Sequence, residues 1–198
     1  MNLWWLLVAV AGLVVLSASV ALARRPTISA TESRVFRAVN RLPDWLYKPL
    51  WLPMQLGNLV VGTVAGLLVA LFDRDVAVAI GVLLAAALKL ITERIVRHEM
   101  ADALAVRQRP GTSQPGAVLR GDVPASGPSF PSGHVILVAA IGSVIAPNVR
   151  AVWWWVPILL ILLVMIGRVY VGAHNPLDVT AGLGAGLLLG GILATFVR

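Results

Sequence analysis

Two of the three histidines in this 198-residue sequence lie in short polar motifs at the borders of apolar runs. His134 ends the stretch Phe-Pro-Ser-Gly-His, and His174 opens His-Asn-Pro-Leu-Asp. An imidazole titrates near neutral pH and can act as a nucleophile or as a proton donor. The third histidine, His98, lies in a charged helical stretch, and we expect it to be solvated. We therefore take His134 and His174 as the candidate chemical groups.

The motif around His134 has the composition of an anion-binding helix start. Ser132 is a favourable N-cap, and Gly133 lets backbone N–H groups approach an anion closely. The N-terminus of a helix attracts anions by itself. His134, in the first turn, could then donate a proton to a leaving oxygen. The alternative is a plain helix cap that happens to carry a histidine.

The motif around His174 adds a cation and a carboxylate. Arg168 lies at the end of an apolar run, where a charge is costly and usually functional. His174 and Asp178 are four residues apart, so on a helical turn the carboxylate would lie beside the imidazole and fix its tautomer. The alternative is a structural His–Asp pair that caps the following helix.

A third cluster, Arg-Gln-Arg-Pro-Gly at residues 107–111, brings two further cations. Guanidinium groups match phosphate oxygens with paired hydrogen bonds, although basic loops beside a membrane are common. Two imidazoles, at least two arginines and an anion-binding helix start together indicate phosphoryl transfer, with one histidine as nucleophile and the other as acid.

The elements that must position these groups are hydrophobic helices. The chain is 59% hydrophobic and 13% charged, with a mean hydropathy of +0.87. A soluble domain of this size cannot bury so much apolar surface, so we expect an all-α integral membrane protein. Six spans are predicted in one helical bundle, at residues 1–23, 49–72, 76–92, 132–147, 151–167 and 177–197.

The connecting segments predict where the site lies. Residues 24–48 are basic and suit an interfacial helix, and residues 93–131 form a long polar segment. The span at 132–147 is short, so its start should lie below the membrane surface. All three clusters fall on one membrane face. We treat residues 1–198 as one membrane domain, with a core at 49–198 that holds the three clusters; a cleaved signal peptide at 1–23 is the alternative for the first span.

The composition also excludes several function classes. The absence of cysteine rules out disulfides and thiolate metal sites. The net charge of +7 is spread over short segments between apolar runs. We therefore expect anionic lipid head groups or a phosphorylated substrate as partners, and no nucleic acid. The oligomeric state stays open.

The combination of Pro-Ser-Gly-His with Arg-x5-His-x3-Asp resembles the second and third signatures of the type 2 phosphatidic-acid phosphatase and vanadium haloperoxidase superfamily, in its membrane branch. The resemblance covers roughly residues 89–186. It implies a lipid-phosphate hydrolase that needs no metal or other cofactor. It assigns His174 as the nucleophile that forms a phosphohistidine, oriented by Asp178, and His134 as the acid. Phosphate binding would fall to Arg168, Arg109, Ser132 and Gly133, with Arg107 as a further cation.

The first signature departs from the family pattern, which has Lys, six residues, then Arg-Pro. Counting back from Arg109 reaches Asp102, so the missing charge would come from Lys89, Arg97 or Arg107. This gap keeps a second hypothesis open, a catalytically weak lipid-phosphate-binding or scaffold protein. A halide-oxidising vanadate enzyme is a third, disfavoured by the membrane architecture. Nothing in the sequence names the lipid.

We expect a multi-pass protein of the cell membrane, and the charge of its loops indicates which side the active face is on. Basic residues between the first two spans place the active face in the cytoplasm by the positive-inside rule, whereas many bacterial relatives work on the outer face.

Overall fold

The computed structural model describes residues 3–25, 27–99 and 107–197, except the side chain of Arg97. Its helical elements are α1 (Leu3–Ala23), α2 (Ala30–Asn40), η1 (Asp44–Leu46), α3 (Tyr47–Met54), η2 (Gln55–Gly57), α4 (Leu59–Asp73), α5 (Val76–Glu99), α7 (Pro110–Ser113), α8 (Gly133–Ile145), η3 (Ala146–Asn148), η4 (Ala151–Trp153), α9 (Trp155–Tyr170) and α10 (Pro176–Ala194). The described residues contain no β-strand, so the all-α prediction is confirmed for them.

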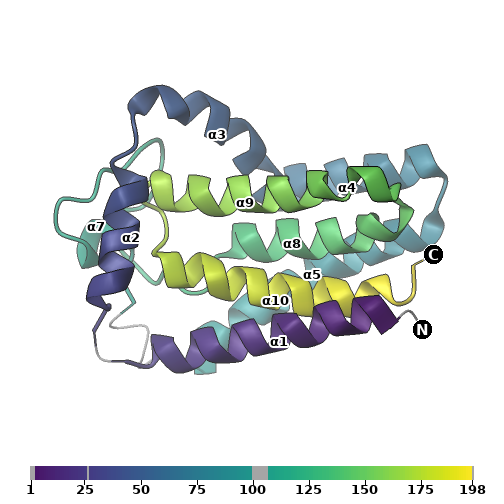
Figure 1. The fold of residues 1–198 in the computed structure, drawn as a ribbon, viewed down its shortest axis with the longest axis horizontal. Helices are drawn as coiled ribbons and strands as arrows, with labels where there is room; N and C mark the ends of the chain where they lie inside the picture. Colours follow the sequence, from purple (N-terminus) through teal and green to yellow (C-terminus); the bar gives the residue numbers. More distant parts are fainter. Residues whose placement is uncertain (1–2, 26, 100–106, 198) are drawn as a thin grey trace.

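The long helices run along one axis, and α2, α3 and α7 gather toward one end of them (Figure 1). Both chain termini and the α4–α5 turn lie at the opposite end (Figure 1). The segment from α7 to α8 and the α9–α10 turn lie at the same end as α2. The three sequence clusters therefore share one end of the bundle, which we call the polar end.

Among the described residues, four helices are long and apolar enough to cross a membrane, at Leu3–Ala23, Val76–Val96, Ala151–Tyr170 and Pro176–Ala194. A fifth candidate is a bent pair, Asp44–Gly57 and Leu59–Asp73, which meet at 74° and form either one broken span or a re-entrant loop. The prediction of six continuous spans is therefore supported only as four or five candidates plus the shorter apolar helix of Gly133–Asn148.

The predicted second span, 49–72, is wrong as a single helix. Asn58 has extended backbone angles (φ −70°, ψ 136°), and its side chain accepts hydrogen bonds from the N–H groups of Val60 and Val61. Asparagine in this geometry caps a new helix rather than continuing the old one. The chain therefore turns at Asn58, between α3 and α4, and an apolar run alone does not reveal that break.

Helix α8 lies at the centre of the bundle and is almost completely buried. Its 13 residues correspond to about 20 Å, well short of a bilayer core of about 30 Å. Helices α4, α5, α9 and α10 pack around it. This arrangement sets the start of α8 inside the molecule, with the short length that the sequence predicted.

Helix α10 approaches two neighbours closely through its glycines. A Cβ at Gly182, Gly186 or Gly190 would lie within 2.7 Å of atoms of Ser132 or α8. A Cβ at Gly184 or Gly191 would similarly collide with the backbone of α1. The small residues therefore let α1 and α8 pack on opposite sides of α10, as expected for membrane helices.

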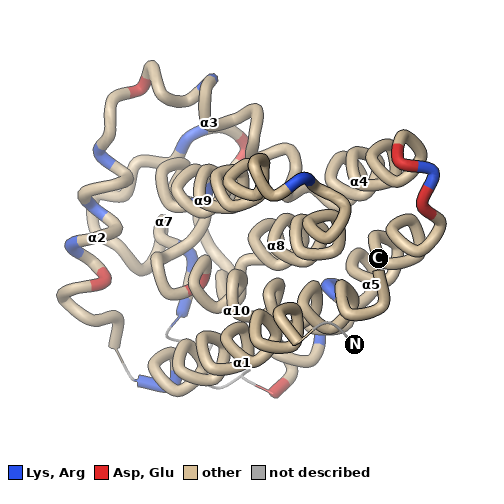
Figure 2. Tube along the Cα trace, turned by 45° about the vertical axis from the view of Figure 1, so that its right-hand side comes forward, with Lys and Arg blue, Asp and Glu red and all other residues tan. Residues whose placement is uncertain are grey.

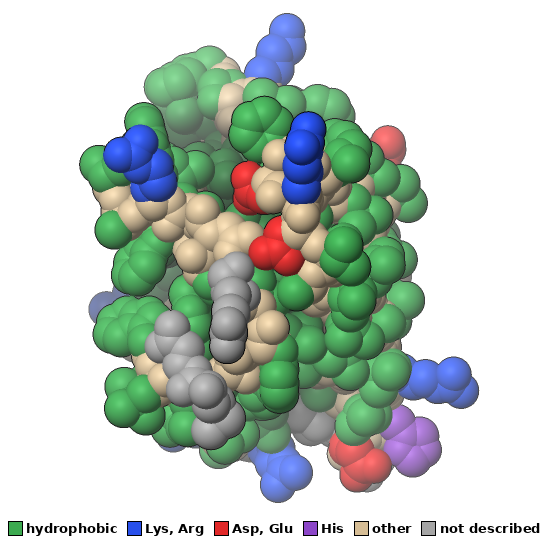
Figure 3. Space-filling model, turned by 90° about the vertical axis from the view of Figure 1, so that its right-hand side faces the viewer, with side chains coloured by type: hydrophobic (Ala, Val, Ile, Leu, Met, Phe, Trp, Pro, Cys, Tyr) green, Lys and Arg blue, Asp and Glu red, His purple; other side chains and the backbone are tan. Residues whose placement is uncertain are grey.

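Charge is distributed unevenly between the two ends. The tube in Figure 2 shows basic positions around α2 and α3, and an acidic–basic–acidic group at the α4–α5 turn. Figure 3 looks onto the end with the termini and shows mostly hydrophobic side chains with scattered charges. At that turn Asp75 accepts hydrogen bonds from Ala77, Val78 and Asn148, and the Asn148 bond is the main reason why its pKa is lowered. The bonds from Ala77 and Val78 are ordinary helix capping, and the Asn148 bond ties this turn to η3.

Candidate active site

The start of α8 is anchored to the start of α10. The backbone N–H of Ser132 donates to the carbonyl oxygen of Asp178 at 3.0 Å, and a Cβ at Gly182 would lie 2.6 Å from the Ser132 carbonyl. Ser132 is the residue before α8, as predicted, but its side chain makes no capping hydrogen bond. Its hydroxyl oxygen is buried without a partner. A buried hydroxyl in this state is costly unless a ligand satisfies it.

His174 lies in the turn between α9 and α10, with 5% of its surface exposed. Its Nδ1 lies 2.8 Å from the carbonyl oxygen of Ser129. Only a protonated Nδ1 can donate to a carbonyl, so this contact fixes the hydrogen on Nδ1 and leaves the Nε2 lone pair available. The tautomer suits a nucleophile.

Asp178 is fully buried and lies 3.8 Å from His174 Nδ1, beyond hydrogen-bonding distance. Its Oδ2 instead accepts the backbone N–H of Asn175 at 2.8 Å, which closes the first turn of α10. The four-residue spacing therefore does bring the carboxylate beside the imidazole. The nearest partner of Nδ1 is nevertheless the Ser129 carbonyl, which the sequence pattern did not predict.

The guanidinium of Arg107 is held by two carboxylates and does not face an open pocket. Its Nε and Nη2 donate to Asp178 at 3.1 and 2.9 Å, and its two terminal nitrogens donate to Glu32 at 3.3 and 2.6 Å. Burial alone would lower the pKa of Arg107, but Asp178 and Glu32 outweigh it and raise the pKa. The expectation that Arg107 binds phosphate conflicts with these contacts, because its donors are engaged.

Glu32 is a site residue that the sequence analysis missed. It lies in the first turn of α2, and its Oε1 also accepts the backbone N–H of Leu177 at 3.1 Å. The sequence pattern at this point, a serine three residues before Glu32, predicts only the start of a helix. In the structure the Ser29 hydroxyl does accept the backbone N–H of Glu32 and caps that helix. Its partners lie 75 and 145 residues away, so no local pattern reveals them.

Arg168 and Arg109 converge on the turn that carries His174. The carbonyl of Arg168, in the last turn of α9, accepts the N–H groups of Ala173 and His174 at 3.1 and 3.3 Å. The Nη1 of Arg109 donates to the Ala173 carbonyl at 3.0 Å. The Nε of Arg168 is buried without a partner. One guanidinium nitrogen and one serine hydroxyl of the predicted phosphate set thus lack partners within the protein.

The charges of these groups reach one another. Arg168, His174, Lys89 and Arg109 all act electrostatically on the His134 imidazole, so the structure brings together the predicted residues from four separate segments. Burial lowers the pKa of His174, and Arg168 and Arg109 push it in the same direction against the opposing effect of Asp178. The lowered pKa keeps His174 neutral near pH 7, and with the hydrogen on Nδ1 the Nε2 lone pair is then free to react.

Lys89 of α5 lies beside the start of α8, although it precedes Arg109 by 20 residues in sequence. A Cβ on Gly133 would lie 2.9 Å from Lys89 Cε and in contact with Glu93 Oε1. Lys89 and Glu93 form an ion pair at 3.1 Å, with side chains 12% and 11% exposed. The prediction ended the third span near residue 92, but α5 continues to Glu99, and this helical geometry aims both side chains at Gly133. The side chain of Arg97 and the whole of Asp102 lie outside the described residues.

Buried amides fix the loop that carries the arginines, and these too were missed. Asn175 accepts from Gln114 Nε2 at 2.9 Å and donates to the Gln108 carbonyl at 3.3 Å. Asn40, at the end of α2, donates to the carbonyls of Val118 and Tyr170 and accepts the N–H of Val118. His98, by contrast, is exposed as expected, with 86% of its side-chain surface accessible.

Comparison with known proteins identifies the family. The model of the PAP2 superfamily matches residues 76–198, which include every cluster described above except α2. The chain belongs to the PAP2 superfamily. This confirms the resemblance seen in the sequence motifs.

Two solved PAP2-type structures share the fold. The phosphatidylglycerolphosphate phosphatase of Bacillus subtilis matches with a TM-score of 0.75 at 22% identity, covering 95% of this chain and 94% of that one. LpxE of Aquifex aeolicus matches with a TM-score of 0.71 at 21% identity, covering 82% and 94%. At these identities the similarity concerns the fold, and it supports a multi-pass membrane protein.

A curated relative is an undecaprenyl-diphosphatase of Sulfolobus acidocaldarius, 46% identical over 55 residues. That match covers 27% of this chain and only 26% of the relative. The chain therefore matches about a quarter of the length of that protein. The family match thus assigns the chain to the PAP2 superfamily, and the two solved structures share its fold.

Proposed function

We propose that this PAP2 protein hydrolyses a lipid-linked phosphate monoester or diphosphate through a phosphohistidine at His174. The observation that carries the proposal is the locked His174 tautomer in a site where Ser132 Oγ and Arg168 Nε are buried without protein partners. A phosphoryl group supplies the acceptor oxygens that both donors lack. Two relatives, named as a phosphatidylglycerolphosphate phosphatase and an undecaprenyl-diphosphatase, support the substrate class.

The first step transfers the phosphoryl group to the enzyme. The Nε2 lone pair of His174 attacks phosphorus, and the bond from phosphorus to the lipid oxygen breaks. His134 donates its proton to that oxygen, so the lipid leaves as an alcohol, or as a monophosphate if the substrate is a diphosphate. The Ser129 carbonyl holds the Nδ1 hydrogen throughout, and the nearby Asp178 carboxylate stabilises the positive imidazole ring.

The second step returns the enzyme to its starting state. Water attacks the phosphohistidine, His134 accepts the proton of that water, and the bond between phosphorus and His174 breaks. Inorganic phosphate is released. No step in this scheme uses a metal ion.

The phosphate-binding set differs from the sequence prediction by one exchange. We assign Arg168, Arg109, Ser132 and the Gly133 backbone to phosphate, and we replace Arg107 by Lys89. Lys89 lies against Gly133 and pairs with one described carboxylate, that of Glu93, whereas Glu32 and Asp178 both hold Arg107. Lys89 therefore supplies the cation that the first signature lacks, from one segment earlier in the chain. This argues against the catalytically weak alternative.

Phosphate release by purified protein tests the proposal. The substrates are phosphatidic acid, phosphatidylglycerol phosphate and a polyprenyl diphosphate, with and without EDTA. We expect release that EDTA does not change, a loss of at least about 10³-fold in His174→Ala, and nearly as much in His134→Ala. A phosphohistidine trapped in wild type by rapid quenching should be absent in His174→Ala.

The opposite results are equally clear. Near-normal rates in either variant would refute the mechanism. Binding of these lipids without any wild-type turnover would support the weakly catalytic binding protein instead. Vanadate-dependent bromination would support the haloperoxidase reading.

We further propose that the polar end faces the cytoplasm, because of the basic residues there: Arg24, Arg25, Arg34, Arg37, Arg41 and Lys48. Ser113 is unsuited to a cysteine probe, since its hydroxyl bonds to the carbonyls of Gln108 and Arg109. Exposed Pro115 at the polar end and exposed Asp73 at the other end suit a matched pair. If the proposal holds, an impermeant thiol reagent applied to intact cells labels Asp73→Cys and spares Pro115→Cys; the reverse pattern places the site outside.

A further inference from the structure

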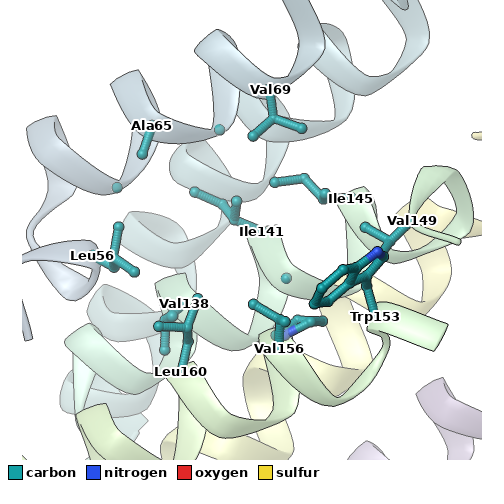
Figure 4. Close-up of a pocket in the computed structure, with 14 residues that line it drawn as sticks. Leu56, Ala65, Val69, Val138, Ile141, Ile145, Val149, Trp153, Val156 and Leu160 are labelled. Atoms are coloured by element: carbon teal, nitrogen blue, oxygen red, sulfur yellow. The ribbon is translucent and has the colours of Figure 1, made fainter. Parts of the chain in front are cut away.

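An apolar crevice of about 350 Å³ lies between α4, α8 and α9, and all its lining residues are apolar or glycine. Figure 4 shows it with Leu56 toward one end and Val149 and Trp153 toward the other. Partly exposed Val69 and Trp153 border it, so it opens toward the lipid-facing surface. Crevices of this kind are unusual in a bundle whose helices otherwise pack closely.

The crevice follows the same face of α8 as His134. Val138, Ile141, Gly142 and Ile145 line it, at steps of four, seven, eight and eleven residues from His134. Residues at such spacings lie on one face of a helix. A group bound at His134 and extended along α8 would therefore enter the crevice directly.

The near end of the crevice touches the site itself. Leu56 lines the crevice, and a Cβ on the next residue, Gly57, would lie 2.6 Å from His134 Cβ and 2.8 Å from His134 Cδ2. The turn at η2 thus joins the crevice to the imidazole. On the opposite wall, Gly62 and Gly66 of α4 also line the crevice, and a Cβ on either would collide with Leu56 or Val82.

We propose that this crevice binds one hydrocarbon chain of the substrate and measures its length, an inference that rests on the proposed function. The leaving oxygen lies at His134, so the chain attached to it runs along α8 toward Trp153. The eleven residues from His134 to Ile145 correspond to about 16 Å. If a methylene group occupies roughly the 30 Å³ of a water molecule in the liquid, the crevice holds on the order of ten carbons of one chain.

Two adjacent leucines of α9 give a matched test. Leu160 lines the crevice, whereas Leu159 does not line it and is 43% exposed. In nanodiscs, Leu160→Trp should lower kcat/KM for decyl phosphate about tenfold and leave that for ethyl phosphate within about twofold. Leu159→Trp should leave both within about twofold. Equal losses for both substrates in Leu160→Trp, or no loss, would overturn the proposal.

A binding measurement separates this inference from the proposed function. The probe is an alkyl phosphonate of ten carbons with a diazirine at its far end, photolysed on the wild-type protein and on His174→Ala. We expect labelling of the η4 segment near Trp153 in both, and labelling near Val138 with a four-carbon probe. Phosphate release without labelling in the crevice would refute the crevice alone. Labelling without phosphate release would refute the proposed function alone.

Discussion

Two arginine-centred regions adjoin the turn that carries His174, and they differ in how fully their polar atoms are paired. Around Arg107, four hydrogen bonds to Glu32 and Asp178 satisfy a buried guanidinium. Around Arg168, the guanidinium Nε and the hydroxyl of nearby Ser132 are buried without a protein partner. The first region is complete without a ligand, which suits a positioning role. In the proposed function, the phosphate of the substrate completes the second region.

The same contrast separates the two roles of Asp178. One oxygen faces Arg107 and the other closes the first turn of α10 by accepting the Asn175 N–H. The carboxylate thereby joins the arginine loop to α10, and Arg107 in turn joins both to Glu32 of α2. Its influence on His174 is electrostatic, across 3.8 Å. Breaking the completed region should therefore change stability first, and breaking the other should change catalysis first.

The largest expected effect is on stability, from Arg107→Met. This change leaves Asp178 and Glu32 buried without their cation, which costs about 3–5 kcal/mol. The free energy of unfolding measured in detergent checks it. The double variant with Glu32→Gln should recover part of the loss. If Arg107→Met is instead stable and mainly raises KM, Arg107 binds phosphate as the sequence pattern first indicated.

The next effect is on catalysis, from Arg168→Lys. Loss of the forked donor should lower kcat/KM about 10²-fold while the unfolding free energy changes little. The control is Arg120→Lys at the same end, because Arg120 donates to the carbonyls of Asn40, Tyr170 and Leu42 and contacts the Tyr170 ring. That variant should lose stability and keep its kcat/KM per folded molecule. If Arg168→Lys instead lost stability and Arg120→Lys lost kcat/KM, the distinction between the two regions would be wrong.

Two serines sharpen the comparison at smaller scale. Ser132→Ala removes an unpartnered buried hydroxyl, so we expect unchanged or higher stability and about a tenfold loss in kcat/KM. Ser129→Ala removes a hydroxyl that donates to the Arg107 carbonyl at 3.0 Å, so we expect a loss of about 1 kcal/mol and little change in kcat/KM. Thermal unfolding and phosphate release on the same preparations distinguish the two, and identical behaviour would contradict the assignment.

The smallest effect concerns pH. Burial, with Arg168 and Arg109, lowers the pKa of His174, and the nucleophile must be neutral. Activity should therefore persist as the pH falls below the ordinary histidine value of about 6.5 and disappear only through the lowered pKa. Arg109→Gln removes one of these positive charges, so the acidic limb of the kcat/KM profile should move to higher pH. Arg120→Gln should leave the limb in place, and a shift to lower pH in Arg109→Gln would contradict the assigned electrostatics.

The free energy of unfolding should also decrease at acidic pH, in the same direction as the activity. The unfolded chain binds a proton on His174 at a higher pH than the folded protein does, so the free energy of unfolding decreases as the pH falls through that window.

Much of the fold and site was predictable from local patterns. Hydropathy located the helices α1, α5, α8, α9 and α10 to within a few residues except at the end of α5, because lipid-facing helices must be apolar along their length. The motifs around His134 and His174 brought out six site residues, since Pro-Ser-Gly-His and Arg-x5-His-x3-Asp encode a helix start and a turn locally. The break at Asn58 escaped, because hydropathy averages over a window that a single capping residue does not change.

The sequence by itself determined the membrane class, the chemistry of the polar motifs and their common end of the bundle, since each depends on residue types and short spacings. Only the tertiary structure decided the partners. It paired Arg107 with Glu32 and Asp178, set the Ser129 carbonyl on His174, brought Lys89 to Gly133, and left a crevice along α8. Such contacts join segments tens of residues apart, and they depend on how α2, α5 and α10 pack rather than on any pattern within one segment.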